Sequence, residues 1–440
     1  MKQQKTLTLI IKMSIPPALS MIIQSLYNLI DSMYVTSYDA KAMEAISIVY
    51  PIQNLILALS VGIGVGMNAC IAMKLGQNKH KEAENVATLG LLLSFIHYGI
   101  VLALGLGLSR VFIESFTQEA KVIDYSLTYI QMMIIFSFTT IFQIAMEKIL
   151  QADGKMALPM ISLLTGAILN VILDPILIFT CDMGLFGAAL ATVIAQVCAT
   201  IVMLGFLISK RNRIRIHFKG FHFDKTNCIS IYRIGIPSFF MNAIPSLMVS
   251  SMNYILVSLH EFAVTTFGLY YKLQYFVYMG VSGIAQGTMP LMSYSYGAAD
   301  HKRLNHILKD ALLLSVGIGA FATLLFMAIP NALMGIFYED DTLLAKTNTF
   351  LRLASIGFCF GCINYLMASY FQSIQKGFSS LLLSLLRQLI FLLPLAYILS
   401  LTLQENGIYL AISIAEILTS SITFLLYFIQ RKRNTSISYS

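Results

Sequence analysis

The sequence predicts an all-α integral membrane protein made of two bundles of six membrane-spanning helices. Three observations predict this fold: the scarcity of charge, the length of the apolar segments and an internal repeat. The chain of 440 residues is 57% hydrophobic and only 11% charged, and its mean hydropathy is +0.76. Soluble domains carry roughly 25% charged residues, so this chain has too few charges to cover a surface that faces water.

Twelve apolar segments are long enough to cross a bilayer. A helix needs about 20 residues to span a hydrocarbon layer of ~30 Å, and segments 86–109 and 311–330 reach that length without Asp, Glu, Lys or Arg. We place the twelve spans at residues 14–35, 45–73, 86–109, 122–147, 158–180, 185–208, 231–258, 264–296, 307–330, 345–370, 378–402 and 407–430.

The second half of the chain repeats the first at a fixed offset of 221 residues. Ile15-Pro16 corresponds in this way to Ile236-Pro237. Further pairs at the same offset are Tyr50 and Tyr271, Gln53 and Gln274, Gly62 and Gly283, Gly66 and Gly287, Gly76 and Gly297, Lys81 and Lys302, Gln151 and Gln372, and Lys155 and Lys376. Six spans per half give both halves the same orientation, so the repeat is related by a pseudo-two-fold axis along the membrane normal.

This repeat divides the chain into two lobes and a connector. We expect an N-terminal lobe at 1–208, a basic cytoplasmic linker at 209–230 and a C-terminal lobe at 231–440. Parallel repeats of this kind are typical of transporters that rock two lobes about a central cavity. The expected architecture is therefore two six-helix lobes that face each other across a V-shaped cleft.

Basic residues collect in alternate loops, which predicts the orientation of the chain. One side holds most of them, including Lys74, Lys79, Lys81, Lys148, Lys155, Lys210, Arg211, Arg213, Arg215, Lys219, Lys302, Arg303, Lys376, Arg431, Lys432 and Arg433. The other side has only Lys41, Arg110, Lys121 and Lys346. By the positive-inside rule, both termini are cytoplasmic. The basic residues of the cytoplasmic loops account for the net charge of +8, so no nucleic-acid partner is expected.

Two carboxylates in the first half lie deep within predicted spans, and an intramembrane carboxylate marks a functional site by default. Counted from the cytoplasmic helix ends at 1.5 Å per residue, Asp31 lies ~25 Å and Asp174 ~24 Å into the membrane. Tyr27 and Asn170 each precede an aspartate by four residues and share its helix face. Thr192, on the sixth span, reaches a similar depth.

These oxygen-bearing groups predict a site for a small hard cation or a shared proton. No Lys or Arg lies at matching depth in the first half to neutralise the carboxylates. Pro175 follows Asp174 directly, removes a backbone donor and promotes a kink there. We therefore expect H⁺ or Na⁺ as the coupling ion, with Asp31, Asp174 and Asn170 as candidate Na⁺ ligands. No other cofactor is expected.

The second half differs at the corresponding positions. The offset takes Asp31 to Met252 and Asp174 to Leu395, so the ion chemistry is expected in the first half alone. Arg387 and Glu416 lie at nearly matching depths on the last two spans, which predicts a structural ion pair.

Candidate residues of a substrate cavity are Lys272, Tyr271, Gln274 and Asn54. The long stem of Lys272 leaves two interpretations open: its ammonium group lines the cavity or snorkels out to the interface. Gly62, Gly64 and Gly66 have the spacing of close contacts between membrane helices.

With these residues located, the sequence resembles the multidrug and toxic compound extrusion family over nearly its whole length. The segments NLID and NVILDP resemble prokaryotic branches that include the DNA-damage-inducible and related bacterial multidrug exporters. The matching segments are SIPPALSMIIQSLYNLIDSMYV (14–35), GVGMNACIAMKLGQNKHKEAENVA (64–87), LQADGKMALPMISLLTGAILNVILDPILIF (150–179), GAALATVIAQ (187–196), GIAQGTMPLMSYSYGAADHKR (283–303) and RQLIFLLPLAYIL (387–399).

The resemblance implies a secondary active antiporter that exports cationic or amphipathic drugs or toxins in exchange for H⁺ or Na⁺. It implies a cation site formed by Asp31, Asn170, Asp174 and Thr192, with Tyr27 beside them. Some branches also have acidic residues on helices seven and ten, which this sequence lacks. We expect a monomeric, multi-pass protein in the lipid bilayer of a prokaryotic plasma membrane.

Three other functions have different sequence signatures. A lipid or polysaccharide-precursor flippase of the same superfamily would favour a strongly cationic cavity and often two further helices. A channel would favour a ring of like residues, whereas the deep aspartates lie in one half only. An enzyme is not expected, because the spans contain no nucleophile–base or metal pair.

Overall fold

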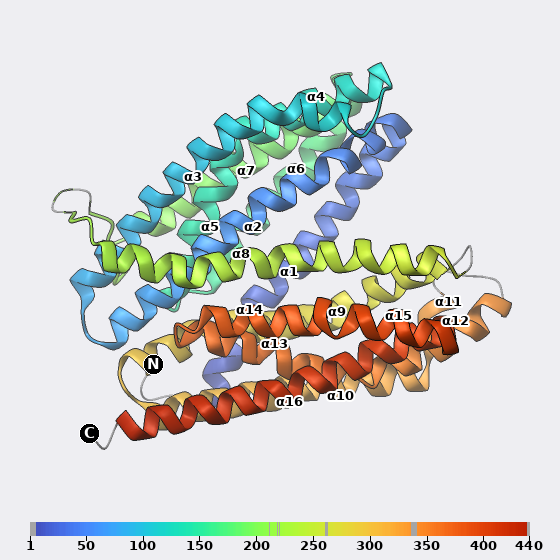
Figure 1. Ribbon diagram of the computed structural model, residues 1–440. Coiled ribbons are helices and arrows are strands. Elements are labelled where there is room, and N and C mark those ends of the chain that lie inside the picture. Colours follow the sequence, from blue (N-terminus) through green and yellow to red (C-terminus); the bar gives the residue numbers. More distant parts are fainter. Residues whose placement is uncertain are drawn as a thin grey trace. The chain divides into compact units, whose positions relative to one another are not determined.

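The computed structural model consists of helices and their connections (Figure 1). It describes residues 6–210, 212–217, 219, 221–259, 263–335 and 341–437, with the backbone alone for Ala40, 341–346 and 431–437. Over these residues there are sixteen α-helices and two π-helical segments, and no strand. The all-α fold class expected from the sequence is confirmed.

The elements follow one another with short connections, apart from the longer segment 209–224 between α7 and α8. They are α1 (Thr6–Tyr38), α2 (Ala40–Gly76), α3 (His80–Glu114), α4 (Ala120–Ile135), α5 (Ser137–Ala152), α6 (Ala157–Pro175), η1 (Ile176–Thr180), α7 (Gly184–Ile208), α8 (Lys225–Val257), α9 (Ala263–Gly297), α10 (His301–Ala328), α11 (Pro330–Gly335), α12 (Asp341–Ser355), α13 (Phe358–Ser373), α14 (Gly377–Leu385), η2 (Leu386–Ile390), α15 (Leu392–Leu403) and α16 (Glu405–Ile437).

Apart from a residue or two at an end or a break, each of the twelve expected spans falls within one helix or within consecutive helical segments. Over the described residues, nine helices are long and apolar enough to span a membrane, and two bent pairs raise that number to eleven. The remaining expected span, 264–296, coincides with α9, a helix of 35 residues. Its tyrosines, serines and glycines make α9 less hydrophobic than the others.

Two spans that the sequence predicts as continuous are broken. The helix axis bends by 41° between α4 and α5, and by 48° between α12 and α13. The breaks fall at Phe136 and Gly357, which correspond at the offset of 221 residues. The Thr139 hydroxyl donates to the Phe136 carbonyl oxygen at 2.7 Å, and the Gly357 N–H donates to Ser413 Oγ at 2.9 Å. Side chains that insert into the backbone ladder in this way are a recognised cause of kinks.

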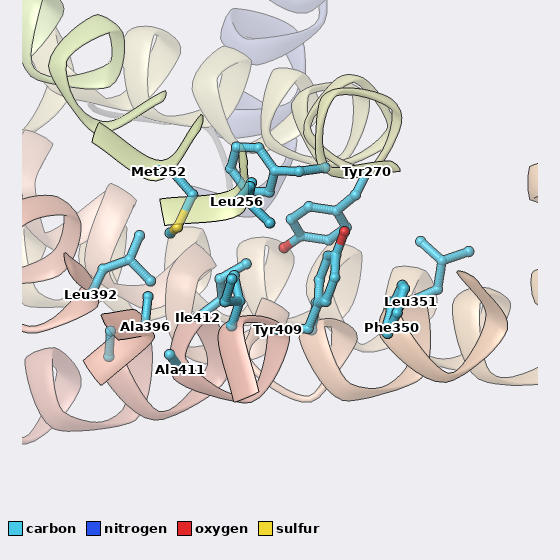
Figure 2. Close-up of a cluster of buried hydrophobic side chains, with 14 of the residues drawn as sticks. Met252, Leu256, Tyr270, Phe350, Leu351, Leu392, Ala396, Tyr409, Ala411 and Ile412 are labelled. Carbon is cyan, nitrogen blue, oxygen red and sulfur yellow. The ribbon is translucent and has the colours of Figure 1, made fainter. Parts of the chain in front are cut away.

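The helices form two compact units, each with its own apolar core. Over the described residues, the first unit comprises 6–14, 240–292 and 301–437, and the second comprises 15–239 and 293–300. The core of the first unit includes Met252, Tyr270 and Tyr409, which Figure 2 shows with their neighbours. The core of the second unit gathers apolar side chains from α1, α2, α4 and α7 among others.

The chain boundaries of these units are explained by helix packing. A Cβ added at Gly62 of α2 would lie 2.8 Å from the carbonyl oxygen of Gly235 in α8. One at Gly66 would overlap the carbonyl oxygen of Ile231, also in α8. The start of α8 therefore packs on α2 within the second unit. This confirms the close helix contacts that the glycine spacing predicts.

The first unit uses the equivalent arrangement. A Cβ at Gly287 of α9, the repeat partner of Gly66, would lie 2.6 Å from the carbonyl oxygen of Met13 in α1. The start of α1 thus packs on α9, just as the start of α8 packs on α2. Each half of the sequence contributes the first turns of its first helix to the unit formed mainly by the other half.

Asp39 fixes the connection that follows the α1 segment carrying Asp31. Its carboxylate accepts from the Lys121 ammonium group at 2.6 Å and from the N–H of Lys41 at 2.9 Å, which caps α2. These two hydrogen bonds, the Lys121 contact foremost, lower the pKa of Asp39. The connection between α1 and α2 is thereby tied to the start of α4.

Candidate cation site

The second unit brings the two deep aspartates together from different helices. Asp31 lies on α1 and Asp174 lies in the last turn of α6, and their carboxyl groups are within hydrogen-bond reach of each other. Asp174 is fully buried, whereas Asp31 is half-buried. The convergence expected from their matching depths is therefore present.

Asn170 and Thr192 join the same group. The Asn170 amide, one turn before Asp174, donates to Asp174 Oδ1 at 3.1 Å and to Thr192 Oγ1 of α7 at 3.4 Å. The α-helix ends at Pro175, which lacks an N–H and so leaves a carbonyl of the preceding turn without its usual donor, and the chain continues as the π-helical turn η1. Such turns recur at functional sites because they reset the direction of nearby side chains.

Two phenols lie beside the carboxylates, and sequence reasoning found only one of them. Tyr27 of α1 is in electrostatic contact with Asp31. Tyr129 of α4 is buried, lies within reach of Gln53 of α2, and is near enough to both aspartates to interact with their charges. Comparing the two halves of the repeat could have identified Tyr129. The residue that corresponds to it at the offset of 221 residues, Phe350, is purely apolar, so the hydroxyl group is present in the first half alone.

Two buried oxygens of the site lack a hydrogen-bond donor. Over the described residues, Asp174 Oδ2 and Asn170 Oδ1 are fully buried and accept no hydrogen bond. No described Lys, Arg or His forms an ion pair with Asp31 or Asp174 either. A buried carboxylate oxygen without a partner costs several kcal/mol, so a proton or cation shared by the two carboxyls would relieve that cost.

The donor set fits H⁺ or a monovalent cation. It consists of oxygens from two carboxyls, one amide, one hydroxyl and the nearby phenols, which are hard ligands. No described cluster of three or more His, Cys, Asp or Glu side chains is present to hold a multivalent metal. The two ionised carboxyl groups neutralise one or two bound positive charges, and each carboxyl group is able to take up a proton.

The corresponding positions in the first unit are apolar. The repeat partners of Tyr27, Asp31, Tyr129, Asn170 and Asp174 are Met248, Met252, Phe350, Phe391 and Leu395, all within or against the apolar core of that unit. Figure 2 shows Met252 and Phe350 in this cluster. The two units therefore share a backbone plan but not the cation chemistry.

The first unit places its own buried charges elsewhere. Arg387 Nε lies 3.6 Å from Glu416 Oε1, and the two side chains are 17% and 7% exposed. The Asn364 amide donates to Glu416 Oε2 at 2.9 Å, and the Tyr278 hydroxyl faces Glu416 Oε1 at 3.4 Å. The predicted proximity of Arg387 and Glu416 is thus present in the structure.

The candidate cavity residues lie in different surroundings. Lys272 is exposed on α9, and Tyr271 and Gln274 on the same helix are half-buried, as is Asn54 on α2. Tyr271 packs against the ring of Phe267, with 6.2 Å between centroids. Asn54 belongs to the second unit and the others to the first, so a joint role in lining a cavity stays a prediction.

Comparison with known proteins gives a consistent result. The sequence model of the MatE family matches residues 16–176 and 237–398. The chain is 25% identical over 431 residues to "Multidrug export protein MepA" of Staphylococcus aureus (strain MSSA476), covering 96% of this chain and 93% of that protein. It is 22% identical over 423 residues to the protein of the same name from Staphylococcus saprophyticus, with the same coverage.

Solved structures share the fold along the whole chain. One is described as the "Outward-facing conformation of a multidrug resistance MATE family transporter of the MOP superfamily"; it matches with a TM-score of 0.92 and 24% identity, covering 100% of this chain and 98% of that one. Another, described as "Crystal structure of MATE in the bent conformation", matches with a TM-score of 0.93 and 24% identity, covering 99% and 100%. The family resemblance seen in the sequence is confirmed: the chain belongs to the MatE family.

Proposed function

We propose that this protein is a secondary active exporter that moves small organic compounds, cationic or amphipathic drugs among them, out of the cell in exchange for H⁺ or Na⁺. Two of its relatives are named multidrug export proteins, which supports the export of drugs. The observation that carries the antiport is the donor-less Asp174 Oδ2 beside Asp31. This pair changes its electrostatic state whenever a cation binds or leaves.

Coupling follows from differential affinity. A ligand shifts a conformational equilibrium only as far as it binds one state better than the other. Asp31, Asp174 and Thr192 come from three separate helices, α1, α6 and α7, so a cation held by all three favours the state in which these helices converge. Drug and cation then exclude each other through this change, without touching. We propose that the two compact units, which correspond to the expected lobes 1–208 and 231–440 except for the exchanged segments 6–14, 225–239 and 293–300, rock during the cycle.

The test is efflux of ethidium from drug-sensitive cells that express the full chain. Imposed H⁺ and Na⁺ gradients are applied separately and together, and an empty vector gives the baseline. Efflux that follows at least one of the two gradients supports the proposal. Efflux that proceeds equally well after both gradients have collapsed would overturn it.

The choice between H⁺ and Na⁺ depends on the neutral ligands. A proton needs only the carboxyl groups, whereas Na⁺ needs several further oxygens. Asn170→Ala and Thr192→Ala should therefore weaken Na⁺-driven efflux by about tenfold and leave H⁺-driven efflux within about twofold, since one hydrogen-bond or ligand contact to a charge is worth ~1.5 kcal/mol. Efflux is measured in the same cells under each gradient alone. Equal losses under both gradients would contradict a specific Na⁺ role for these two residues.

We further propose that the protein lies in the plasma membrane of a prokaryote with both termini in the cytoplasm; the terminal residues 1–5 and 438–440 themselves lie outside the described residues. In a cysteine-free background, Lys41→Cys and Asp182→Cys should react with an impermeant maleimide from outside, and Lys79→Cys and Arg215→Cys should not. The background is required because native Cys181 is exposed. A permeant maleimide should label all four variants. Labelling of the second pair alone by the impermeant reagent would reverse the orientation.

We propose that Arg387 and Glu416 act as a structural ion pair in the first unit. Removing one partner leaves an uncompensated buried charge and should cost roughly 3 kcal/mol, whereas removing both should cost clearly less than the sum. The measurement is a double-mutant cycle of Arg387→Gln and Glu416→Gln by thermal unfolding in detergent. A double variant as unstable as the sum of the single variants would show that the two charges act independently.

A further inference from the structure

The guanidinium group of Arg387 makes fewer hydrogen bonds than expected for a buried ion pair. Buried Arg–carboxylate pairs commonly form two hydrogen bonds of ~2.8 Å. Here a single nitrogen, Nε, approaches Glu416 at 3.6 Å, which is beyond hydrogen-bond length. Among the described residues, no side chain or carbonyl accepts a hydrogen bond from any of the five N–H groups of Arg387.

Glu416 is held in place by other donors. Asn364 donates to its Oε2 at 2.9 Å and also to the Glu416 carbonyl oxygen at 2.9 Å. The orientation of the Asn364 amide is fixed in turn, because its Oδ1 accepts from Ser420 at 3.1 Å and from Thr423 at 3.0 Å. The carboxylate is therefore anchored by its neighbours and does not turn to meet the guanidinium group.

The unused donors of Arg387 keep some access to solvent and lie beside an aromatic surface. None of its nitrogens is among the fully buried polar atoms that lack a partner, and its side chain is 17% exposed. Its guanidinium carbon lies 5.5 Å from the ring centroid of Tyr278. The ring of Tyr278 is stacked on that of Tyr365, at 6.3 Å and 14°. The planar guanidinium group of Arg387, with its unused N–H donors, therefore lies next to the flat apolar surface of the two tyrosine rings.

We propose that Arg387, Tyr278 and Tyr365 form a subsite for the carboxylate end of aromatic amphipathic substrates. The guanidinium fork binds the carboxylate through two parallel hydrogen bonds, and the tyrosine rings pack against the aromatic body. Glu416 opposes an incoming anion, but the anion on the open side of the fork is closer to the guanidinium group than to Glu416, so attraction prevails. This inference rests on the proposed export function and assigns the carboxylate of such substrates to named residues of the first unit.

The test compares two ligands that differ only in the carboxylate: norfloxacin and its methyl ester. Binding to the purified full chain in detergent is followed by ligand fluorescence anisotropy, which is favoured because the chain contains no tryptophan. The wild type should prefer the acid by at least about tenfold, as expected for charge-assisted hydrogen bonds. Arg387→Lys keeps the charge without the fork and should lower this preference severalfold.

The decisive variant carries Arg387→Gln and Glu416→Gln together, because it leaves no uncompensated charge to unfold the protein. It should bind acid and ester equally. Arg352→Gln, an exposed arginine on α12 of the same unit, is the matched control and should keep the wild-type preference. Equal affinity of the wild type for both ligands, or an unchanged preference in the double variant, would overturn the subsite.

Ethidium, which has no carboxylate, separates this inference from the antiport itself. Cells with Arg387→Lys should lose norfloxacin efflux severalfold more than they lose gradient-driven ethidium efflux. If neither compound is exported by the wild type while the purified protein still prefers the acid, the proposed export function fails and the subsite stands. If ethidium efflux is gradient-driven but acid and ester bind alike, the subsite fails and the export function stands.

Discussion

Asp31→Asn and Asp174→Asn should each reduce gradient-driven ethidium efflux to the level of cells with an empty vector. The two carboxyls are within hydrogen-bond reach, so either amide keeps the shape of the site while removing one exchangeable negative charge. Driving a two-state exchange nearly to completion takes about 5.5 kcal/mol of differential binding. Among the described carboxylates, only Asp31 and Asp174 act electrostatically on each other at this site. Drug binding to the purified variants should stay within about threefold of the wild type, because the cation acts through conformation.

The matched control is Asp124→Asn, which removes an exposed carboxylate from α4 in the same unit. It should export ethidium at the wild-type rate. Wild-type efflux in cells with Asp31→Asn and in cells with Asp174→Asn would place the driving ion elsewhere. Loss of drug binding together with efflux would indicate that the substitutions damage the fold rather than the coupling.

Gly66→Ala should strongly destabilise the protein, although alanine is the better helix former. The added Cβ would overlap the carbonyl oxygen of Ile231, a backbone atom that cannot rotate away. Overpacking typically costs about 1–3 kcal/mol, and a backbone clash belongs at the upper end or beyond. We expect a markedly lower Tm in detergent and reduced yield of monodisperse protein.

Gly99→Ala provides the control, since nothing lies within 4 Å of a Cβ added at this exposed position of α3. There the helix propensity of alanine should stabilise by about 0.5–1 kcal/mol. The two substitutions are chemically identical, so opposite signs would isolate the helix contact. Equal Tm values for Gly66→Ala and the wild type would mean that α2 and α8 are not in close contact.

The repeat made much of this fold predictable, because it provides two independent copies of each helix signal. The approximate positions of all spans and the meeting of Asp31 with Asp174 follow from apolar length and depth alone. The bends at Phe136 and Gly357 do not. At Phe136 no proline or glycine announces the break, and the second bend depends on Ser413, a residue of another helix that no local pattern connects to it.

Side-chain partners were less predictable than helix positions. Tyr129 and Gln53 join the cation site from helices whose rotation about their own axes the sequence does not define. The pairing of Arg387 with Glu416 was foreseeable from depth, but the anchoring of Glu416 by Asn364 was not, because asparagine in a membrane helix has many available partners. The depth of a residue along a helix can be counted from the sequence. The direction in which its side chain points around the helix axis depends on how the helices pack.

The exchange of helix starts also affects how the chain is made. The second unit includes residues 225–239 and 293–300, so a ribosome must have passed residue 300 before that unit can close. The first turns of α1 are synthesised at the outset, yet their partner Gly287 arrives far later. Long-range pairing of this kind slows folding and leaves unfinished surfaces exposed during synthesis. The two homologous halves therefore do not coincide with the two compact units, and neither unit has all of its residues until late in translation.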